Sequence, residues 1–183
     1  IALTVAILLN QKLKGSSFFQ FVYFLPMVTA TIAVGIVWKW MYHYDYGIIN
    51  YVLGVIGIEP VKWMENPRMA LAALIIYGIW TKLPFTIILF LSGLQTIGEQ
   101  YYTAAKVDGA NAFQRFFKIT LPSLSNVMFF CFITLTADSW KIFNEPFMLQ
   151  GPGTSNVSLF QYMYESGFNV FKLGYASAIG CML

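Results

Sequence analysis

Residues 99–122 read EQYYTAAKVDGANAFQRFFKITLP, and this polar stretch between two apolar runs decides how the chain is interpreted. Residues 99–108 are mostly good helix formers, and Gly109 follows them at a position where a positive φ costs little and a helix can end. Asn111 suits the N-cap of a second helix over residues 112–119. The stretch, named here the glycine-turn segment, predicts a short helix, a tight turn and a second short helix.

The second predicted helix of the glycine-turn segment has one aromatic face. Phe113, Phe116 and Phe117 follow the i, i+3, i+4 spacing that places side chains together on a helix. Pro122 is tolerated in the first turn of the next membrane span, where no backbone N–H is needed. The polar side chains that this leaves for water or for a partner are Lys106, Gln114, Arg115 and Lys118.

The composition around this segment is that of an integral membrane protein. Of the 183 residues, 58% are hydrophobic and 10% are charged, whereas a soluble domain carries roughly 25% charged residues. This excludes an ordinary soluble enzyme and a disordered chain, which needs low hydrophobicity and high charge. The net charge of +3 comes from scattered Lys and Arg residues rather than a basic patch, so a nucleic-acid binder is disfavoured.

Apolar runs predict an all-α polytopic membrane protein. A spanning helix needs about 20 mostly apolar residues to cross about 30 Å of hydrocarbon. Residues 18–41, 69–94 and 124–143 meet this requirement, and their continuous runs favour helices over the alternating strands of a barrel. Residues 1–9 and the run from 173 onward are predicted to be parts of two further membrane helices, so we expect a fragment of a longer protein.

Positive charges predict the orientation of these spans, because Lys and Arg concentrate in cytoplasmic loops. Lys12 and Lys14 follow the first apolar run, and three more basic residues lie in the glycine-turn segment. Both places fall on one side if the chain crosses at each span, and we predict that this side is cytoplasmic.

A cluster of aromatic residues follows the first complete span. Amphipathic rings favour the headgroup layer of a bilayer, so we predict an interfacial belt there, with a sugar-stacking platform as the alternative. His43 lies in the cluster with no second His or Cys nearby, and we therefore expect no metal site. The rings of the cluster are Trp38, Trp40, Tyr42, Tyr44 and Tyr46.

The glycine-turn segment also carries a longer motif: an aromatic residue, three small residues, two further residues, Asp-Gly-Ala, and then Ile-x-Leu-Pro. Its residues are Tyr102, Thr103, Ala104, Ala105, Asp108, Gly109, Ala110, Ile119, Leu121 and Pro122. With this spacing the segment resembles the cytoplasmic loop of permease subunits in binding-protein-dependent ATP-binding-cassette importers. The resemblance is to the carbohydrate-uptake branch, with its maltose and glycerol-3-phosphate permeases. That family usually has Glu where this chain has Thr103, and the resemblance leaves Asp108 as the acidic contact.

The resemblance extends over nearly the whole chain and implies a type I importer permease fold. It implies a single, partial permease domain over residues 1–183, from the end of the second helix to the start of the sixth. In the family, a loop at the position of residues 99–122 docks into a groove on the ATPase. Further stretches that resemble the branch are 25–26, 46–50, 92–97, 143–145, 151–153 and 174–178.

The function that the resemblance implies is sugar import across a bacterial cytoplasmic membrane by a multi-pass transport subunit that is not itself an enzyme. The implied partners are a second related permease subunit, two ATP-binding-cassette ATPase subunits, an extracytoplasmic solute-binding protein, a sugar and membrane lipid. The chain has no Gly-x-x-x-x-Gly-Lys-Ser/Thr phosphate loop. We therefore expect no cofactor in this chain and ATP hydrolysis by the partner.

Polar residues within the apolar runs are candidates for the substrate path, because charges inside a bilayer are costly. Sugar hydroxyls need hydrogen-bond donors and acceptors, and aromatic rings stack on pyranose faces. A structural ion pair between Asp138 and Lys141, at i, i+3 on one helix, is the alternative for those two residues. The candidates are Trp80, Lys82, Asp138, Trp140, Lys141, Asn144 and Glu145.

The sequence also bears on two other function classes. An ion-gradient-driven secondary transporter would use Lys82, Asp138 and Glu145 as coupling groups and would not need the glycine-turn segment. A membrane enzyme has no support, because the sequence holds no His-rich cluster, paired catalytic carboxylates or nucleophile motif. A requirement for ATP and a separate ATPase in uptake discriminates the importer from the secondary transporter.

Overall fold

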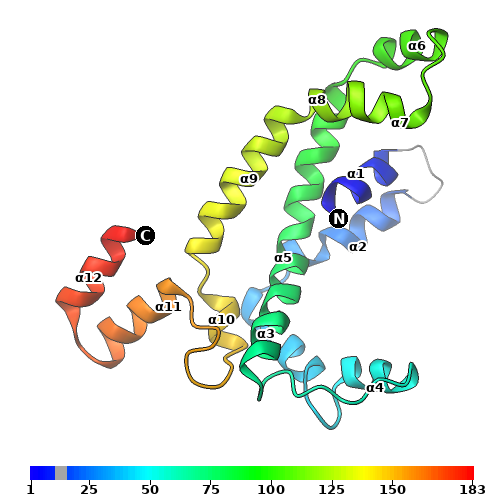
Figure 1. The fold of residues 1–183 in the computed structure, drawn as a ribbon. Helices are drawn as coiled ribbons and strands as arrows, with labels where there is room; N and C mark the ends of the chain where they lie inside the picture. Colours follow the sequence, from blue (N-terminus) through cyan, green and yellow to red (C-terminus); the bar gives the residue numbers. More distant parts are fainter. Residues whose placement is uncertain (11–15) are drawn as a thin grey trace. The chain divides into compact units, whose positions relative to one another are not determined.

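A computed structural model describes residues 1–10 and 16–183, which form helices and turns with no strand among these residues (Figure 1). The chain divides into two compact units: unit 1 is Ile1–Val28 with Lys82–Leu135, and unit 2 is Thr29–Thr81 with Thr136–Leu183. Lys12 and Lys14, used above for orientation, lie outside the described residues. The elements are α1 (Ala2–Asn10), α2 (Ser16–Val28), α3 (Thr31–Met41), α4 (Ile48–Val55), α5 (Pro67–Thr96), α6 (Glu99–Val107), α7 (Ala112–Arg115), η1 (Phe116–Thr120), α8 (Leu121–Ser123), α9 (Ser125–Trp140), α10 (Asn144–Met148), α11 (Leu159–Tyr164), η2 (Glu165–Asn169) and α12 (Leu173–Met182).

Helix α5 is the one helix of the described part that is long and apolar enough to cross a membrane by itself. Its 30 residues, Pro67–Thr96, confirm the predicted span over 69–94. The helix continues through Pro84, which has no N–H to donate. Close by, the hydroxyl of Thr86 donates to the carbonyl of Lys82 at 2.9 Å.

Neither of the other two predicted spans is one continuous helix of spanning length. Residues 18–41 are divided between α2 and α3, with Ala30 in an extended conformation at φ −64° and ψ 119°. The run 124–143 is helical only from Ser125 to Trp140. The described residues therefore hold up to three spans if each broken pair counts as one. A hydropathy window averages over about 20 residues, so it detects apolar length but not a change of ψ at one residue.

The core of unit 1 forms where α1, α5 and α9 pack together, and Ala6, Ile87, Phe90 and Cys131 are buried there. Gly93 allows α5 to approach the start of α9 closely. A Cβ at this position would lie 2.8 Å from Leu124 Cδ2 and 2.9 Å from Val127 Cγ2. A larger residue at 93 would therefore push these two helices apart.

The core of unit 2 is aromatic and corrects the prediction of an interfacial belt. Tyr42 is only 1% exposed, and its hydroxyl donates to Ala73 O at 3.1 Å. Trp38 packs against Tyr42, Tyr77 and Trp80, with ring centroids 5.4–5.5 Å apart. Of the five predicted belt residues, Tyr42 is thus buried in the core, and the half-buried Trp38 packs against it. The sequence reasoning failed here because a run of rings does not indicate which of them point inward.

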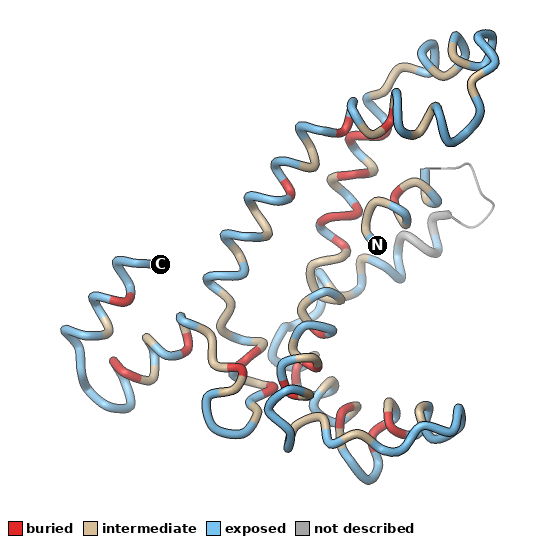
Figure 2. Tube along the Cα trace, viewed as in Figure 1, coloured by how far each residue is buried: buried red, intermediate tan, exposed pale blue. Residues whose placement is uncertain are grey.

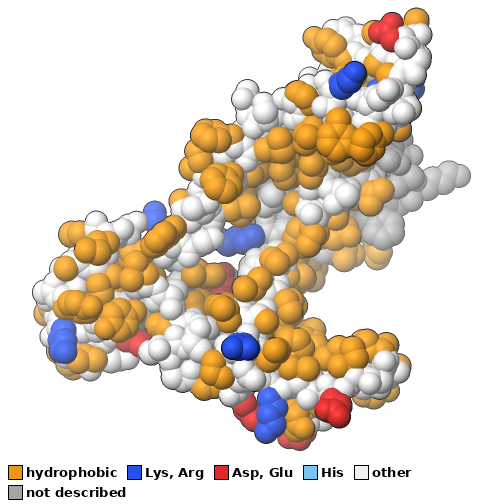
Figure 3. All heavy atoms as spheres, in the orientation of Figure 1, with side chains coloured by type: hydrophobic (Ala, Val, Ile, Leu, Met, Phe, Trp, Pro, Cys, Tyr) orange, Lys and Arg blue, Asp and Glu red, His pale blue; other side chains and the backbone are white. Residues whose placement is uncertain are grey.

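Large apolar side chains stay exposed on both units, as the space-filling view shows (Figure 3). On α9, the exposed side chains include Phe129, Phe130, Phe132 and Ile133. Contiguous apolar surface of this kind marks a membrane or a protein interface.

Candidate functional site

The glycine-turn segment belongs to unit 1, and its helices α6 and α7 follow one another around the turn at Gly109 (Figure 1). Figure 2 shows that both are mostly exposed, in contrast to the buried positions along α5. Helix α6 begins after Gly98, with Glu99 in its first turn and Lys106 in its last. These charges oppose the helix dipole at each end and stabilise the helix.

The turn after α6 has the hydrogen bonds of a Schellman motif. The N–H of Gly109 donates to Lys106 O at 3.1 Å, and the N–H of Ala110 donates to Ala105 O at 2.9 Å. Gly109 has a φ of +76°, which a side chain with a Cβ adopts only with strain. The structure confirms the predicted glycine-terminated helix.

A complete capping box begins the second helix. The N–H of Gln114 donates to Asn111 Oδ1 at 2.8 Å, and the N–H of Asn111 donates to Gln114 Oε1 at 2.9 Å. Asn111 was predicted as the cap, but the reciprocal role of Gln114 was missed. The three-residue spacing of the two side chains was the signal for it.

The predicted helix over 112–119 is only partly α-helical. Helix α7 ends at Arg115, and η1 follows as a π-helix in which the N–H of Leu121 donates to Phe116 O, five residues back. Pro122 cannot donate to Lys118 O, so the α-helical pattern cannot continue there. Pro122 lies in the short α8, and the direction then changes by 60° before α9. The prediction that Pro122 lies in the first turn of the long helix was therefore wrong.

One side-chain bond ties the two arms of the segment together. The hydroxyls of Tyr102 on α6 and Thr120 on η1 lie 2.9 Å apart. Thr103, which stands where the resembling family has Glu, uses its hydroxyl within α6 and donates to Glu99 O at 3.1 Å. The segment is therefore a closed unit held by its own caps, and Thr103 offers a partner no charge.

The residues predicted for the substrate path fall in both units. Trp80 packs on Trp38 and Tyr77 in the core of unit 2, whereas Lys82 belongs to unit 1. Asp138 lies in α9, but Lys141 lies beyond the end of that helix, and its N–H donates to Asp138 O in a turn at 3.2 Å. The premise that both residues share one helix was therefore wrong.

Asn144 and Glu145 form the first turn of α10, while Trp140 ends α9. Helix α10 packs on α3 where Gly35 has no side chain, since a Cβ there would lie 2.9 Å from Met148 Cγ. Phe143 lies just before α10. Its ring centroid is 5.2–5.5 Å from the ring centroids of Phe147, Phe160 and Tyr164. The substrate-path role of all seven candidates stays a prediction.

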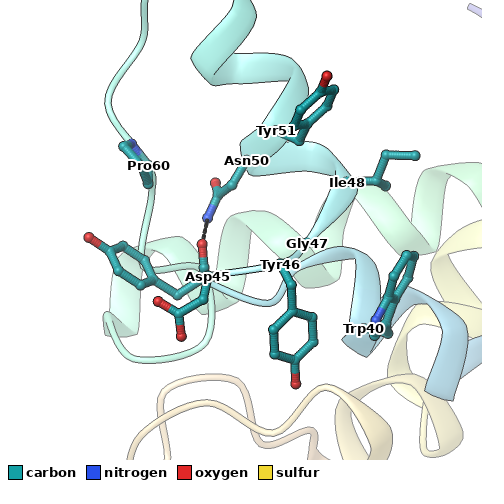
Figure 4. Close-up of a pocket in the computed structure, with 9 residues that line it drawn as sticks. Trp40, Asp45, Tyr46, Gly47, Ile48, Asn50, Tyr51 and Pro60 are labelled. Carbon is teal, nitrogen blue, oxygen red and sulfur yellow. Dashed lines mark hydrogen bonds between the residues drawn. The ribbon is translucent and has the colours of Figure 1, made fainter.

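The loop around α4 carries a pocket of about 380 Å³ (Figure 4). Trp40, Tyr44 and Tyr46 line it together with Asp45 and Tyr51. Three of the five rings predicted as a belt or sugar platform thus share this pocket. For these three rings both interpretations stay predictions.

Asn50 organises this loop and was not predicted to do so. Its amide is 5% exposed, donates to Tyr44 O and Val61 O at 3.1 and 3.0 Å, and accepts from Val61 N and Trp63 Nε1 at 3.1 and 2.9 Å. Gly47 is equally constrained, since a Cβ there would lie 2.3 Å from His43 O. Nothing near Asn50 in the sequence identifies these partners, because Val61 and Trp63 follow it by 11 and 13 residues.

Residues 1–183 match the family described as "Binding-protein-dependent transport system inner membrane component". The trehalose/maltose transport system permease protein MalF of Thermococcus litoralis is 36% identical over 186 residues, which cover 100% of this chain and 62% of that protein. The sulfoquinovosyl glycerol transport system permease protein SmoG of Agrobacterium fabrum is 36% identical over 161 residues, covering 87% of this chain and 52% of that protein. The chain thus spans between half and two thirds of the length of these relatives.

A solved structure supplies the fold. A chain in the crystal structure of a bacterial alginate ABC transporter, in complex with an alginate pentasaccharide-bound periplasmic protein, aligns with a TM-score of 0.88 at 23% identity. The alignment covers 99% of this chain and 65% of that chain. This likeness confirms the predicted all-α importer permease fold.

Proposed function

This chain belongs to the family of inner membrane components of binding-protein-dependent transport systems, and we propose that it is a permease subunit of an ATP-driven sugar importer. It contributes to the path of the solute and couples that path to a cytoplasmic ATPase through residues 99–122. ATP is bound and hydrolysed by the partner subunit, and this chain holds no cofactor.

The observation that carries the proposal is the construction of the glycine-turn segment. Its Schellman turn, its capping box and the bond from Tyr102 to Thr120 hold the two arms in one conformation. Its outer surface meanwhile stays exposed, as at Phe113, which is 72% exposed. A segment that is held in one conformation and exposes apolar side chains suits docking into a groove of another protein.

The segment is joined to long helices at both ends, which suits the transmission of movement. Only Ile97 and Gly98 separate α5 from α6, and only Leu124 separates α8 from α9. At the same place Gly93 lets α5 pack closely on Leu124. A displacement of the docked glycine-turn segment is therefore transmitted to α5 and α9, because no flexible linker separates them from it. ATP-driven closure of the ATPase dimer supplies such a displacement.

The partners we propose are a second, related permease subunit, two ATPase subunits and an extracytoplasmic solute-binding protein. The similar alginate transporter was crystallised with a sugar-bound periplasmic protein. Relatives named for trehalose/maltose and sulfoquinovosyl glycerol transport support a sugar or sugar-like solute. Trp80, Lys82, Asp138, Trp140, Lys141, Asn144 and Glu145 remain our candidates for contacts with it.

We place the glycine-turn segment on the cytoplasmic side of a bacterial cytoplasmic membrane. Lys106, Arg115 and Lys118 lie within it, and Lys and Arg are concentrated in cytoplasmic loops. This placement brings the segment to the compartment that contains ATP.

The test is uptake of a radiolabelled sugar by proteoliposomes that contain the full-length protein with its partner subunits. The sugar is the one found on the purified solute-binding protein. We expect uptake only with ATP on the ATPase side and the loaded binding protein on the other. An ATPase variant unable to hydrolyse ATP is the control and should abolish uptake. Uptake driven by a proton or sodium gradient without ATP would overturn the proposal in favour of a secondary transporter.

A further inference from the structure

The two arms of the glycine-turn segment enclose a pocket of about 440 Å³. Helix α6 and the turn line one side of it, and α7 with η1 lines the other. The lining residues are Ala105, Asp108, Gly109, Ala110, Gln114, Arg115, Lys118 and Ile119. Two of them are cationic and one is anionic, so the pocket carries a formal charge of +1.

Arg115 is the lining residue whose hydrogen bonding is incomplete. Its Nε atom is buried and has no hydrogen-bond partner. A buried donor without a partner costs free energy, and the cost is larger for a charged group. Among the described residues, Asp108 forms no ion pair with Arg115 or Lys118, although all three line the same pocket. Arg115 thus brings to the pocket a guanidinium whose hydrogen bonding the described residues leave incomplete.

The rim of the pocket at the turn is open. A Cβ built on Gly109 would meet nothing within 4 Å. The space directly beside Gly109 is therefore open. Lys118, which also lines the pocket, is exposed as well.

We propose that this pocket receives the carboxylate of an Asp or Glu side chain of the ATPase subunit. The inference rests on the proposed function. The planar fork of Arg115 matches a carboxylate, and Lys118 adds a second positive charge. Asp108 in the lining disfavours a dianionic phosphate but leaves one net positive charge for a monoanion. Docking would then place one buried acid–base contact beside the glycine that shapes the turn.

The test is carbodiimide coupling in the purified, full-length importer in lipid nanodiscs, followed by mass spectrometry. The reagent joins an amine to a carboxylate only where the two are in contact. We expect Lys118 to be joined to an Asp or Glu of the ATPase and expect Lys118→Arg to lose that product. Lys106→Gln is the matched control, because Lys106 is exposed on α6 but does not line the pocket. It should leave the product unchanged.

The rate of ATP-dependent uptake provides an independent test of the carboxylate contact. Arg115→Gln should reduce the rate of ATP-dependent uptake by about tenfold, as expected for loss of a hydrogen-bonded charge. Arg115→Lys should restore part of this rate, because it returns the charge without the fork. Equal rates in Arg115→Gln and the unsubstituted importer would overturn the proposal.

A photo-crosslinking residue in place of the exposed Ala104 separates this inference from the proposed function. If position 104 captures the ATPase but Lys118 is never joined to it, the segment docks and the carboxylate proposal is wrong. If neither position captures the ATPase, docking itself is wrong and both proposals fall. A product that joins Lys118 only to Asp108 of this chain would also overturn the inference.

Discussion

The glycine-turn segment and the loop around α4 are both irregular connections, but they are held in opposite ways. Hydrogen bonds between residues at most five apart fix the turn and the cap of the first, as at Gly109 and Asn111. The second is held by one buried amide, Asn50, whose partners lie up to 13 residues away. A connection of the first kind keeps its shape while its surface stays free for a partner. A connection of the second kind depends on a packed core.

The largest expected effect is at Asn50. Asn50→Leu leaves Val61 N–H and Trp63 Nε1 without their acceptor, and each such buried group costs roughly 1–3 kcal/mol. We expect unfolding in detergent, followed by tryptophan fluorescence, to show a loss of roughly 3–5 kcal/mol. Asn66→Ala is the control, because Asn66 Oδ1 caps the exposed start of α5 with a single bond to Arg68 N. Equal losses of unfolding free energy in the two variants would show that Asn50 does not hold its loop more strongly than a single exposed cap holds a helix.

Substitution of Gly109 tests the local turn. Gly109→Val places a β-branched side chain at a φ of +76°, where left-handed backbone costs at least about 1–2 kcal/mol for residues with a Cβ. We expect this variant to reach the membrane and to lose uptake. Gly109→Asn should retain most of it, because Asn tolerates this backbone conformation. Normal uptake by Gly109→Val would exclude the turn from the mechanism.

A smaller effect is expected from the capping box. Asn111→Ala removes the acceptor of Gln114 N–H and should cost about 1 kcal/mol. Hydrogen exchange with mass spectrometry should show about fivefold faster exchange in the peptide over 112–118. Asn126→Ala, on the exposed surface of α9, is the matched control and should leave that peptide unchanged. Unaltered exchange in Asn111→Ala would mean that neighbouring contacts, and not the cap, maintain α7.

The smallest effect concerns the bond between the two arms. A double-mutant cycle with Tyr102→Phe and Thr120→Val should give a coupling energy of about 0.5–1.5 kcal/mol, measured by unfolding in detergent. A coupling energy of zero would show that the two arms are held only by the turn and the cap.

Local signals predicted the turn and the start of the second helix in the glycine-turn segment, although the reciprocal role of Gln114 was missed. Gly109 and Asn111 each indicated their conformation through their own chemistry and their immediate neighbours. Apolar length predicted α5 correctly, because a helix of 30 residues satisfies its backbone hydrogen bonds within itself. It failed at Ala30, where one residue with a ψ of 119° divides an apolar run.

By itself, the sequence determined a helical, apolar chain and a helix–glycine turn–helix motif, because spacing along the chain encodes both. Only the tertiary structure decided that Tyr42 is buried while Tyr46 is exposed, and that Asn50 holds Val61 and Trp63. The pocket that presents Arg115 between two arms likewise depends on the fold. The physical reason is that burial and hydrogen-bond pairing depend on residues that are far apart in the sequence and meet only in the folded chain. The identity of sequence neighbours does not determine them.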